Sequence, residues 1–243
     1  MGWLGKRLKK NGIAISDHYA RTEAYFDLTP AGRTLIDTLD PLIASHARGL
    51  VLDAGAGRLT YAKRLKAFST GVVSIDRDRV FPGISAVADL ESIPFAKRSF
   101  DSVFCSQVLE HVANPMAVLL EFYRILEPGG KLILSVPHLA YLHNEPHDYY
   151  RYTEYGLEHL LAHAGFEVIE MRWSGGVLSF LGHLPSTLLL NLTWGIPGLF
   201  DLLFWLNRGW SRLIGRIEGN DRKQKRFALN IALVAKKPES PFK

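Results

Sequence analysis

LVLDAGAGR, residues 50–58, is the stretch of this sequence that decides the fold. An apolar run too short for a helix ends in Asp53, and Gly55 and Gly57 follow at the spacing D-x-G-x-G, just before the helix-prone run LTYAKRLKAF. This order predicts a buried strand, a tight turn and a helix. Glycines let the backbone turn sharply and let a ligand approach without meeting a Cβ, while Asp53 sets a carboxylate beside the helix start. The combination suits a polar, partly cationic ligand.

Length and composition limit the class of protein. With 243 residues, of which 47% are hydrophobic and 22% charged, the chain can bury one large core or a core plus an insertion. Intrinsic disorder is therefore excluded as the main state. A net charge of +5 and a pI near 9.3 raise the question of nucleic acid. Because the basic residues are spread out and no nucleic-acid motif occurs, the sequence argues against a nucleic-acid partner.

The single cysteine, Cys105, excludes an internal disulfide framework and a thiolate metal cluster, which agrees with a reducing compartment. Residues 1–16 hold no apolar stretch long enough for a signal peptide, so a cytoplasmic location is expected. The basic residues at positions 6, 7, 9 and 10 predict a solvated, frayed terminus, and the alternative is contact with an anionic membrane surface. Thr29 and Pro30 predict the start of a helix that runs towards Pro41. Residues 1–46 are thus expected to form a helical cap on the core.

Beyond the glycine turn, strand and helix signals alternate, which predicts a parallel sheet with helices on both faces. The further strands are expected at GVVSIDRD, ISAVAD, FDSVFCSQ, KLILSVPH, EVIEMRW and RFALNIALVAKK, with helices capped by Asn114 and Thr153 and ended by Gly129 and Gly165. Residues 77–83 are too few for a crossover helix and are expected to form an open loop. Asp76 ends the second strand, where nucleoside-binding sheets grip a ribose, and the alternative is a turn aspartate.

Four segments together carry a family resemblance. VLDAGAG, SIDRD, ADLESIPFAKRSFDSVFCSQVLEHV and RILEPGGKLILSVP resemble, in content and order, the motifs of class I S-adenosylmethionine-dependent methyltransferases. The similarity covers residues 50–173, and the final strand rejoins it at Phe227. One D-x-G-x-G is a weak signal, whereas the ordered set is specific. The resemblance implies a doubly wound, seven-stranded mixed α/β sheet, whose last strand is antiparallel and lies between the fifth and sixth.

The resemblance also implies S-adenosyl-L-methionine as cofactor and assigns its site. The expected cofactor-binding residues are Asp53, Ala54, Gly55 and Gly57 near the methionyl part, Asp76 on the ribose with Arg77 beside it, Asp89 and Leu90 on the adenine, and Ser106 and Gln107 along the methionyl side. Leu59 stands where the family often has a third glycine, which would move the helix start slightly away from the ligand. The short link after Asp76 puts the depth of the adenine pocket in doubt.

HLAYLHNEPHDYYRYT, residues 138–153, is the segment most suited to face a substrate, because it starts at the carboxyl end of a strand. Tyr149, Tyr150 and Arg151 are its expected substrate-facing residues. His138 and His147 are candidate general bases, since an imidazole titrates near neutral pH, but capping and loop-ordering hydrogen bonds explain them about as well. The histidines show no repeated carboxylate–histidine spacing and no cysteine accompanies them, so no metal site is expected.

Residues 175–225 form an insertion before the last strand. Residues 173–200 carry no formal charge, a length that could cross a bilayer, but Pro185 and Pro197 interrupt the run and favour broken helices lining a cavity. Within residues 198–217, arginines recur on one helix face and leucines and tryptophans on another: Arg208, Arg212 and Arg216 against Leu202, Leu206, Leu213, Ile217, Trp205 and Trp210. This is typical of an interfacial helix, and a helical lid with a solvated arginine edge fits as well.

The sequence therefore predicts a methyltransferase that moves a methyl group to an oxygen, nitrogen or carbon of a small molecule, in the narrower expectation a lipophilic one. Its core would comprise residues 47–174 and 226–238, with residues 175–225 as an apolar lid and peripheral membrane contact through residues 198–217. A nicotinamide-dependent oxidoreductase is disfavoured because G-x-G-x-x-G is absent after the first strand. The other alternative is a catalytically silent module that binds membrane or protein.

Overall fold

The computed structural model describes residues 2–78, 81–218 and 226–239. It divides into two compact units. The core unit comprises Leu39–Arg172 and the C-terminal segment from Asn230, and the helical unit comprises the segment up to Thr38 and Trp173–Leu229. The N-terminal segment and the insertion, which the sequence analysis treated separately, thus share one unit. Residues 219–225 of the expected insertion lie outside the described residues.

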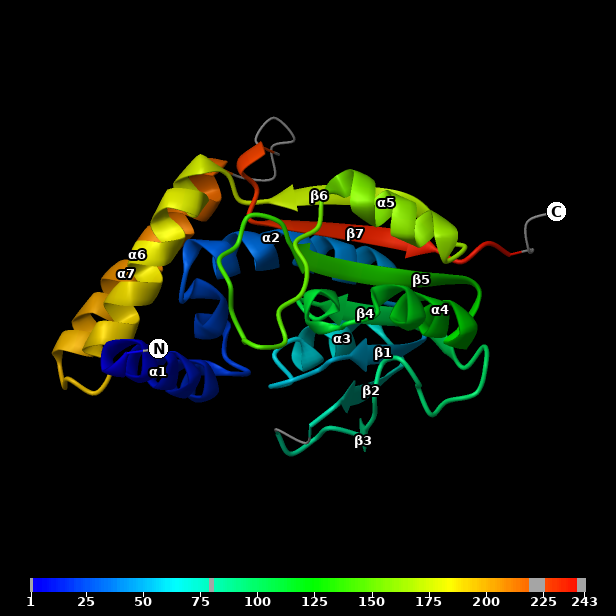
Figure 1. Ribbon diagram of the computed structural model, residues 1–243, viewed down its shortest axis with the longest axis horizontal. Helices are drawn as coiled ribbons and strands as arrows, with labels where there is room; N and C mark the ends of the chain where they lie inside the picture. The colour runs from blue at the N-terminus through cyan, green and yellow to red at the C-terminus, as the bar shows by residue number, and fades with distance from the viewer. Residues whose placement is uncertain (1, 79–80, 219–225, 240–243) are drawn as a thin grey trace. The chain divides into compact units, whose positions relative to one another are not determined.

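A seven-stranded sheet forms the core unit, in the order β3-β2-β1-β4-β5-β7-β6 (Figure 1). The strands are β1 (Leu50–Ala54), β2 (Gly71–Asp76), β3 (Ala86–Val87), β4 (Phe100–Ser106), β5 (Leu126–Pro137), β6 (Glu167–Ser174) and β7 (Asn230–Lys236). Strand β7 pairs antiparallel with β5, whereas β1, β2, β3, β4 and β5 pair parallel. The expected mixed sheet with an antiparallel last strand between the fifth and sixth is confirmed. Burial of nearly every β7 residue explains its unbroken apolar sequence.

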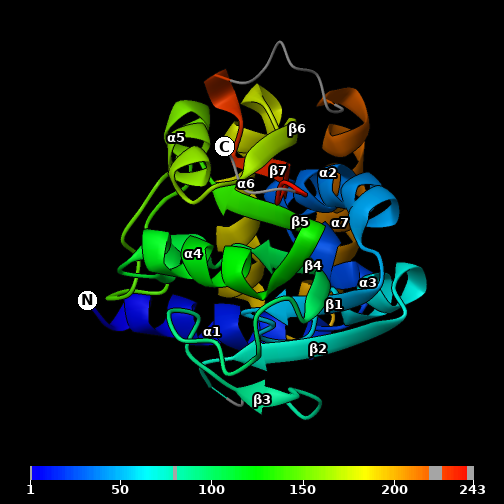
Figure 2. The ribbon, with the colours of Figure 1, turned by 90° about the vertical axis from the view of Figure 1, so that its right-hand side faces the viewer.

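Helices cover both faces of this sheet. The core unit holds α3 (Ala62–Phe68), α4 (Pro115–Ile125), α5 (Glu154–His163) and the C-terminal part of α2 (Pro30–His46), with α4 and α5 on the face opposite α2 and α3 (Figure 2). The expected caps are present, because Asn114 Oδ1 accepts a hydrogen bond from the Ala117 amide at 3.2 Å and Thr153 Oγ1 accepts one from Gly156 at 3.1 Å. A short 3₁₀ turn, η2 (Leu109–His111), follows β4.

Two expected helix ends were misplaced. Helix α2 begins at Pro30, with Thr29 Oγ1 accepting from the Gly32 amide at 3.2 Å, but it continues through Pro41 to His46. Helix α4 ends at Ile125 rather than at the Gly129–Gly130 pair, since β5 begins at once and Gly129 turns within that strand at φ +80°.

The helical unit contains α1 (Trp3–Tyr19), the 3₁₀ turn η1 (Glu23–Asp27), α6 (Val177–Thr193) and α7 (Leu199–Glu218). The expectation of a frayed terminus was wrong, because α1 packs Ile15 against Leu190, Phe200 and Phe204 in a buried cluster. The side-chain amide of Asn11 also donates to the Asn191 carbonyl at 2.8 Å. Within the described residues, no helix is long and apolar enough to cross a membrane.

Glu218, at the end of α7, caps the start of α6. Its buried carboxylate accepts hydrogen bonds from the amides of Gly176 and Ser179 at 3.0 Å and of Leu178 at 2.6 Å. An anion at a helix N-terminus satisfies amides that have no partner within the helix. The uncharged run of residues 173–200 therefore obtains its helix cap from a distant part of the chain.

Two arginines of α7 pair with a buried carboxylate. Asp27, whose side chain is fully buried, accepts from Arg208 Nε at 2.9 Å, and Arg212 Nη2 lies 2.8 Å from the same carboxylate oxygen. The expected solvated edge is wrong for Arg208, whose side chain is 18% exposed, because a buried carboxylate needs paired cations. Arg212 contacts the same carboxylate, but its side chain stays 44% exposed. Arg216 remains exposed.

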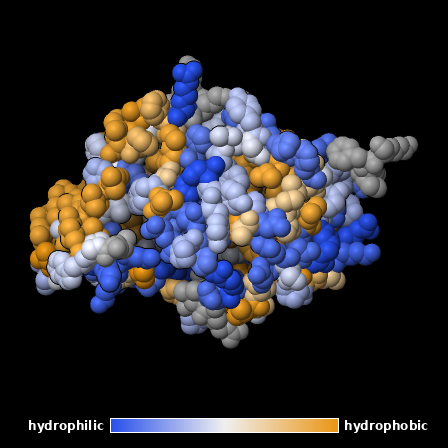
Figure 3. All heavy atoms as spheres, in the orientation of Figure 1, coloured by the Kyte–Doolittle hydropathy of each residue, from blue (hydrophilic) through white to orange (hydrophobic). Residues whose placement is uncertain are grey.

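The exposed surface of α6 and α7 is instead apolar. Hydrophobic side chains gather over these two helices (Figure 3). The most exposed of them, each with at least half of its surface accessible, are Leu181, Leu184, Leu192, Leu202, Trp205, Leu206 and Ile217. A large exposed apolar patch is more often a site of contact with a partner, ligand or membrane than a part of the ordinary protein surface.

Candidate functional site

The carboxyl ends of β1, β2 and β4 lie side by side at one edge of the sheet, where open α/β sheets bind ligands. At the end of β1, Gly55 and Gly57 adopt φ values of +72° and +47°, which L side chains rarely adopt. A Cβ on Gly55 would lie 2.5 Å from a methyl carbon of Val108. The turn therefore requires glycine at position 55, and it is closed by the amides of Gly55 and Ala56, which donate to the Ile75 carbonyl at 2.9 Å.

Asp76 ties the end of β2 to this turn. Its Oδ2 accepts a hydrogen bond from the Gly57 amide at 2.8 Å, and its Oδ1 accepts one from the Asp78 amide at 3.2 Å. A carboxylate oxygen has two lone pairs, so each oxygen keeps one for a further donor such as a ribose hydroxyl. Arg77 follows at the exposed start of the loop.

Asp53 is buried beside the turn. Its Oδ2 lies 3.5 Å from the Ser74 hydroxyl. The pKa of the Asp53 carboxyl is raised from its usual value to about 7, chiefly by burial; the Ser74 hydrogen bond opposes this rise and the Asp76 carboxylate adds to it. A ligand cation at this position would favour the ionised form.

Leu59 occupies the position where the resembling family often has a third glycine, and it adopts a glycine-like φ of +59°. Its side chain is 9% exposed, so burial offsets the cost of a left-handed conformation, about 1–2 kcal/mol. Helix α3 begins only at Ala62. The helix start thus lies further along the chain than the run LTYAKRLKAF suggested.

The expected adenine-side residues follow β3. The Glu91 amide donates to Asp89 Oδ1 at 2.9 Å, and Leu90 is 8% exposed. The open loop expected at residues 77–83 carries no helix in its described part, and residues 79 and 80 lie outside the described residues.

Ser106 and Gln107 leave the sheet at the end of β4, next to the glycine turn. Ser106 Oγ lies 2.8 Å from Ser135 Oγ and 3.3 Å from the Tyr61 hydroxyl. Gln107 has a φ of +57° and its amide donates to the Ser135 carbonyl at 2.9 Å. The sheet edge thus gathers the polar residues expected along the methionyl side.

A long loop joins β5 to α5 (Figure 1). Polar groups of the loop itself hold it in place. Arg151 donates to both carboxylate oxygens of Asp148, at 2.7 and 2.8 Å, and to the carbonyls of Ala140 and Tyr141. This guanidinium holds the pKa of the Asp148 carboxyl well below its usual range. Arg151 therefore orders the loop, and its expected contact with a substrate stays a prediction.

The remaining residues predicted in this loop also have partners. The amides of Tyr149 and Tyr150 donate to the Glu110 carbonyl at 2.9 and 3.3 Å. His138 Nδ1 lies 2.7 Å from the Tyr152 carbonyl oxygen, so that nitrogen carries the proton and Nε2 is the basic atom of the neutral ring. His147 Nδ1 lies 3.0 Å from the Tyr149 hydroxyl.

A family model described as a methyltransferase domain matches residues 52–134, which run from the glycine turn to β5. This segment of the chain is therefore similar to a methyltransferase domain. The malonyl-[acyl-carrier protein] O-methyltransferase of Serratia marcescens is 27% identical over 135 residues, which cover 51% of this chain and 53% of that protein. The demethylmenaquinone methyltransferase of Mycobacterium sp. (strain KMS) is 36% identical over 93 residues, which cover 35% of this chain and 40% of that protein.

The chain spans about half or less of the length of those curated relatives. Among solved structures, the [4+2]-cyclase SpnF superposes with a TM-score of 0.60 at 20% identity, covering 84% of this chain and 81% of that one. A likeness at this identity shows a shared fold only.

Sequence reasoning missed Glu110 and His111, although both stand in the quoted motif LEHV within the matched segment. They lie in η2, directly after β4, and His143 approaches them from the loop between β5 and α5. The Glu110 side chain is fully buried. The acidic residue within a largely apolar run is the sequence signal that could have identified this site, because a carboxylate is rarely buried without a partner.

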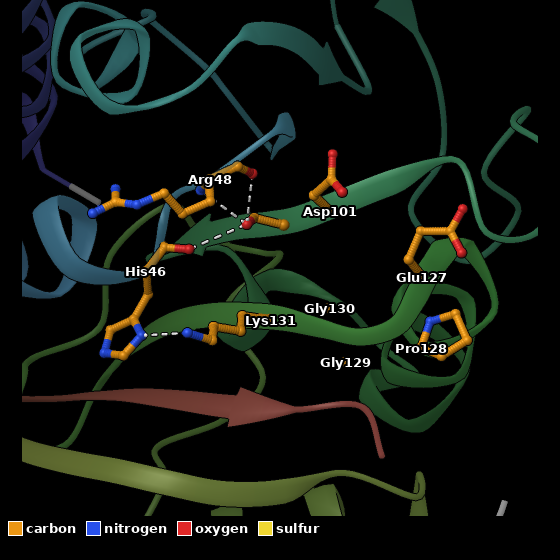
Figure 4. A pocket seen from close by; sticks show the side chains of 9 residues that line it. His46, Arg48, Asp101, Glu127, Pro128, Gly129, Gly130 and Lys131 are labelled. Carbon is orange, nitrogen blue, oxygen red and sulfur yellow. Dashed lines mark hydrogen bonds between the residues drawn. The ribbon is translucent and has the colours of Figure 1, made fainter. Parts of the chain in front are cut away.

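A cavity of about 250 Å³ lies at the opposite edge of the same sheet (Figure 4). Its lining includes Asp101 and Ser102 from the start of β4 and Lys131 from the start of the regular part of β5. Lys131 Nζ lies 3.2 Å from His46 Nδ1. Methyltransferases of this fold bind their ligands at the carboxyl ends of the strands, so this cavity is not the cofactor site.

Proposed function

We propose that this chain is an S-adenosylmethionine-dependent methyltransferase that acts on a small-molecule acceptor. The observation that carries the proposal is the hydrogen bond from the Gly57 amide to Asp76, which joins the glycine turn to the acid at the tip of the next strand. Together they form one cradle for a nucleoside with a cationic tail. The buried Asp53 beside it suits the ammonium of the methionyl part.

Methyl transfer from S-adenosylmethionine requires mainly that the acceptor atom be aligned with the methyl group. The methyl group of a sulfonium is already electrophilic, so the protein has to hold the acceptor atom in line with the carbon–sulfur bond at near-attack distance. When the acceptor's lone pair attacks the methyl carbon, the carbon–sulfur bond breaks, its electron pair stays on sulfur, and the acceptor loses its proton. Only a weakly acidic acceptor requires a base, for which His138 presents a free Nε2 in its neutral form.

Equilibrium binding tests the cofactor assignment directly. Calorimetry with purified protein should give saturable binding of S-adenosylmethionine and of its demethylated product, and none of NAD. Binding of NAD and not of S-adenosylmethionine would support a nicotinamide-dependent enzyme. Binding of neither would support a catalytically silent module with the same fold.

The acceptor that fits this chain best is lipophilic and is reached at a membrane surface. The exposed apolar side chains of α6 and α7 support this proposal, as do the quinone names of several curated relatives. Because Arg208 and Arg212 pair with Asp27, contact with lipid would rest on the apolar face and not on these arginines.

Vesicle sedimentation tests that proposal. The chain should sediment with phosphatidylglycerol vesicles and stay bound at high salt, since apolar insertion is not screened. Trp205→Ser and Leu206→Ser, at side chains that are each 61% exposed, should lower binding at least about tenfold. Ile169→Ser, at an exposed apolar residue of β6, is the matched control and should bind as the parent does. A parent chain that ignores vesicles, or variants that bind equally, would contradict the membrane proposal.

A further inference from the structure

Glu110 is the buried charge that the cofactor cradle does not use. Within the described part of the chain, neither of its carboxylate oxygens has a hydrogen-bond partner, although its side chain is fully buried. Leaving a buried polar group unsatisfied costs on the order of 1–3 kcal/mol, and more when the group is charged. Both oxygens can therefore accept a further ligand.

Two imidazoles face this carboxylate. His111 Nε2 lies 3.6 Å and His143 Nε2 3.8 Å from Glu110 Oε1. Both distances are too long for hydrogen bonds, which span about 2.7–3.2 Å. They are close to the separation of about 3.4 Å that two donor atoms show when each binds one tetrahedral ion with bonds of about 2.1 Å. One donor atom from each of the three residues falls within 4.8 Å of the others.

The outer nitrogens of both imidazoles are already held. His111 Nδ1 lies 2.6 Å from the His147 carbonyl oxygen, which can only accept, so Nδ1 carries the proton and Nε2 presents a lone pair. His143 Nδ1 lies 3.3 Å from the Tyr141 carbonyl oxygen and 3.3 Å from Arg151 Nη2. A carbonyl or carboxylate behind the outer nitrogen is the usual support of a metal-binding histidine.

We propose that Glu110, His111 and His143 bind a divalent transition-metal ion. Two imidazoles and one carboxylate suit zinc, iron(II), manganese(II) or cobalt(II), and they leave coordination positions open. No metal was expected from the sequence, because the histidines show no repeated carboxylate–histidine spacing and no cysteine accompanies them. His143 is separated from Glu110 and His111 by a helix and a strand. Folding brings these two parts of the chain together.

The ion would act as a Lewis acid in methyl transfer. An open coordination position can take a hydroxyl oxygen, and the metal lowers the pKa of that hydroxyl, so that the acceptor loses its proton near neutral pH. The site follows Gln107 by three residues, on the same sheet edge as the cradle. This part of the proposal rests on the proposed function, whereas metal binding itself does not.

The competing account is an internal ion pair. The Glu110 carboxylate raises the pKa of His143, so a protonated His143 would neutralise it without any metal. That account predicts no uptake of zinc. Adventitious uptake would occur instead at the exposed pair His159 and His163 on α5, whose rings lie 4.1 Å apart.

Titration of the full, tag-free chain with zinc chloride, followed by calorimetry, distinguishes the accounts. The parent and His163→Ala should each bind one zinc ion per chain with equal affinity, whereas Glu110→Gln and His143→Ala should bind at least about tenfold more weakly. Cobalt(II) should give visible absorption bands that these two variants lose. Circular dichroism and affinity for S-adenosylmethionine confirm that each variant is folded, and His143, with 37% of its side chain exposed, is the substitution least disruptive to packing.

No uptake by the parent, or uptake that only His163→Ala removes, would overturn the metal site. Loss of methyl transfer on chelation, with cofactor binding intact, would support the acid role. Transfer that continues unchanged in a metal-free chain would overturn that role, and failure to bind S-adenosylmethionine would count against the proposed function alone.

Discussion

At the scale of single residues, Asp53 should make the affinity for S-adenosylmethionine depend on pH. Its carboxyl has a pKa of about 7 because it is buried, so the cofactor-free protein binds a proton there below neutrality. If the cofactor's ammonium requires the ionised carboxylate, binding releases this proton. The affinity for S-adenosylmethionine should then fall about tenfold per pH unit below pH 7 and level off above it. Calorimetry between pH 5 and 8 measures the slope, and Asp53→Asn should bind weakly with no slope.

Asp76 provides the second residue-scale test. Asp76→Ala removes the acceptor of the Gly57 amide and the expected partner of the ribose hydroxyls. The affinity for S-adenosylmethionine should fall by about 1–3 kcal/mol, as the loss of charged hydrogen bonds implies. Asp78→Ala, at the exposed carboxylate two residues on, is the matched control. Equal affinities for both variants and the parent would refute the cradle.

The candidate bases are tested through turnover. If His138 or His147 removes the acceptor proton, its replacement by alanine should lower kcat about a hundredfold or more and leave cofactor affinity intact. Losses under about threefold for both would leave alignment, or the proposed metal ion, as the source of the rate.

At the scale of elements, η1 and α7 are joined by the buried carboxylate of Asp27. Arg208→Ala would remove its most buried partner, with 18% of the side chain exposed, and should lower the free energy of unfolding by about 3–5 kcal/mol. Arg216→Ala, on an exposed side chain of the same helix, should change it by less than about 0.5 kcal/mol. Chemical denaturation followed by tryptophan fluorescence measures both. Equal effects would mean that the arginines of α7 act as surface charges after all.

At the scale of the whole molecule, the sequence predicted what local patterns control. The parallel strands, the antiparallel last strand and the caps Asn114 and Thr153 follow from apolar runs, resemblance and short-range hydrogen bonds. The partner of Arg208 could not be predicted, because Asp27 lies far away in sequence and helical spacing alone cannot show which face is buried. For the same reason the sequence did not join His143 to Glu110.

The most direct test of the account follows the methyl group itself. Purified protein is incubated with methyl-labelled S-adenosylmethionine and a cell extract, which is then separated into lipid, small-molecule, protein and nucleic-acid fractions. The account predicts label in the lipid or small-molecule fraction, and its near loss with Asp76→Ala. Label confined to protein or nucleic acid, or no labelled product from a folded chain that binds the cofactor, would contradict it.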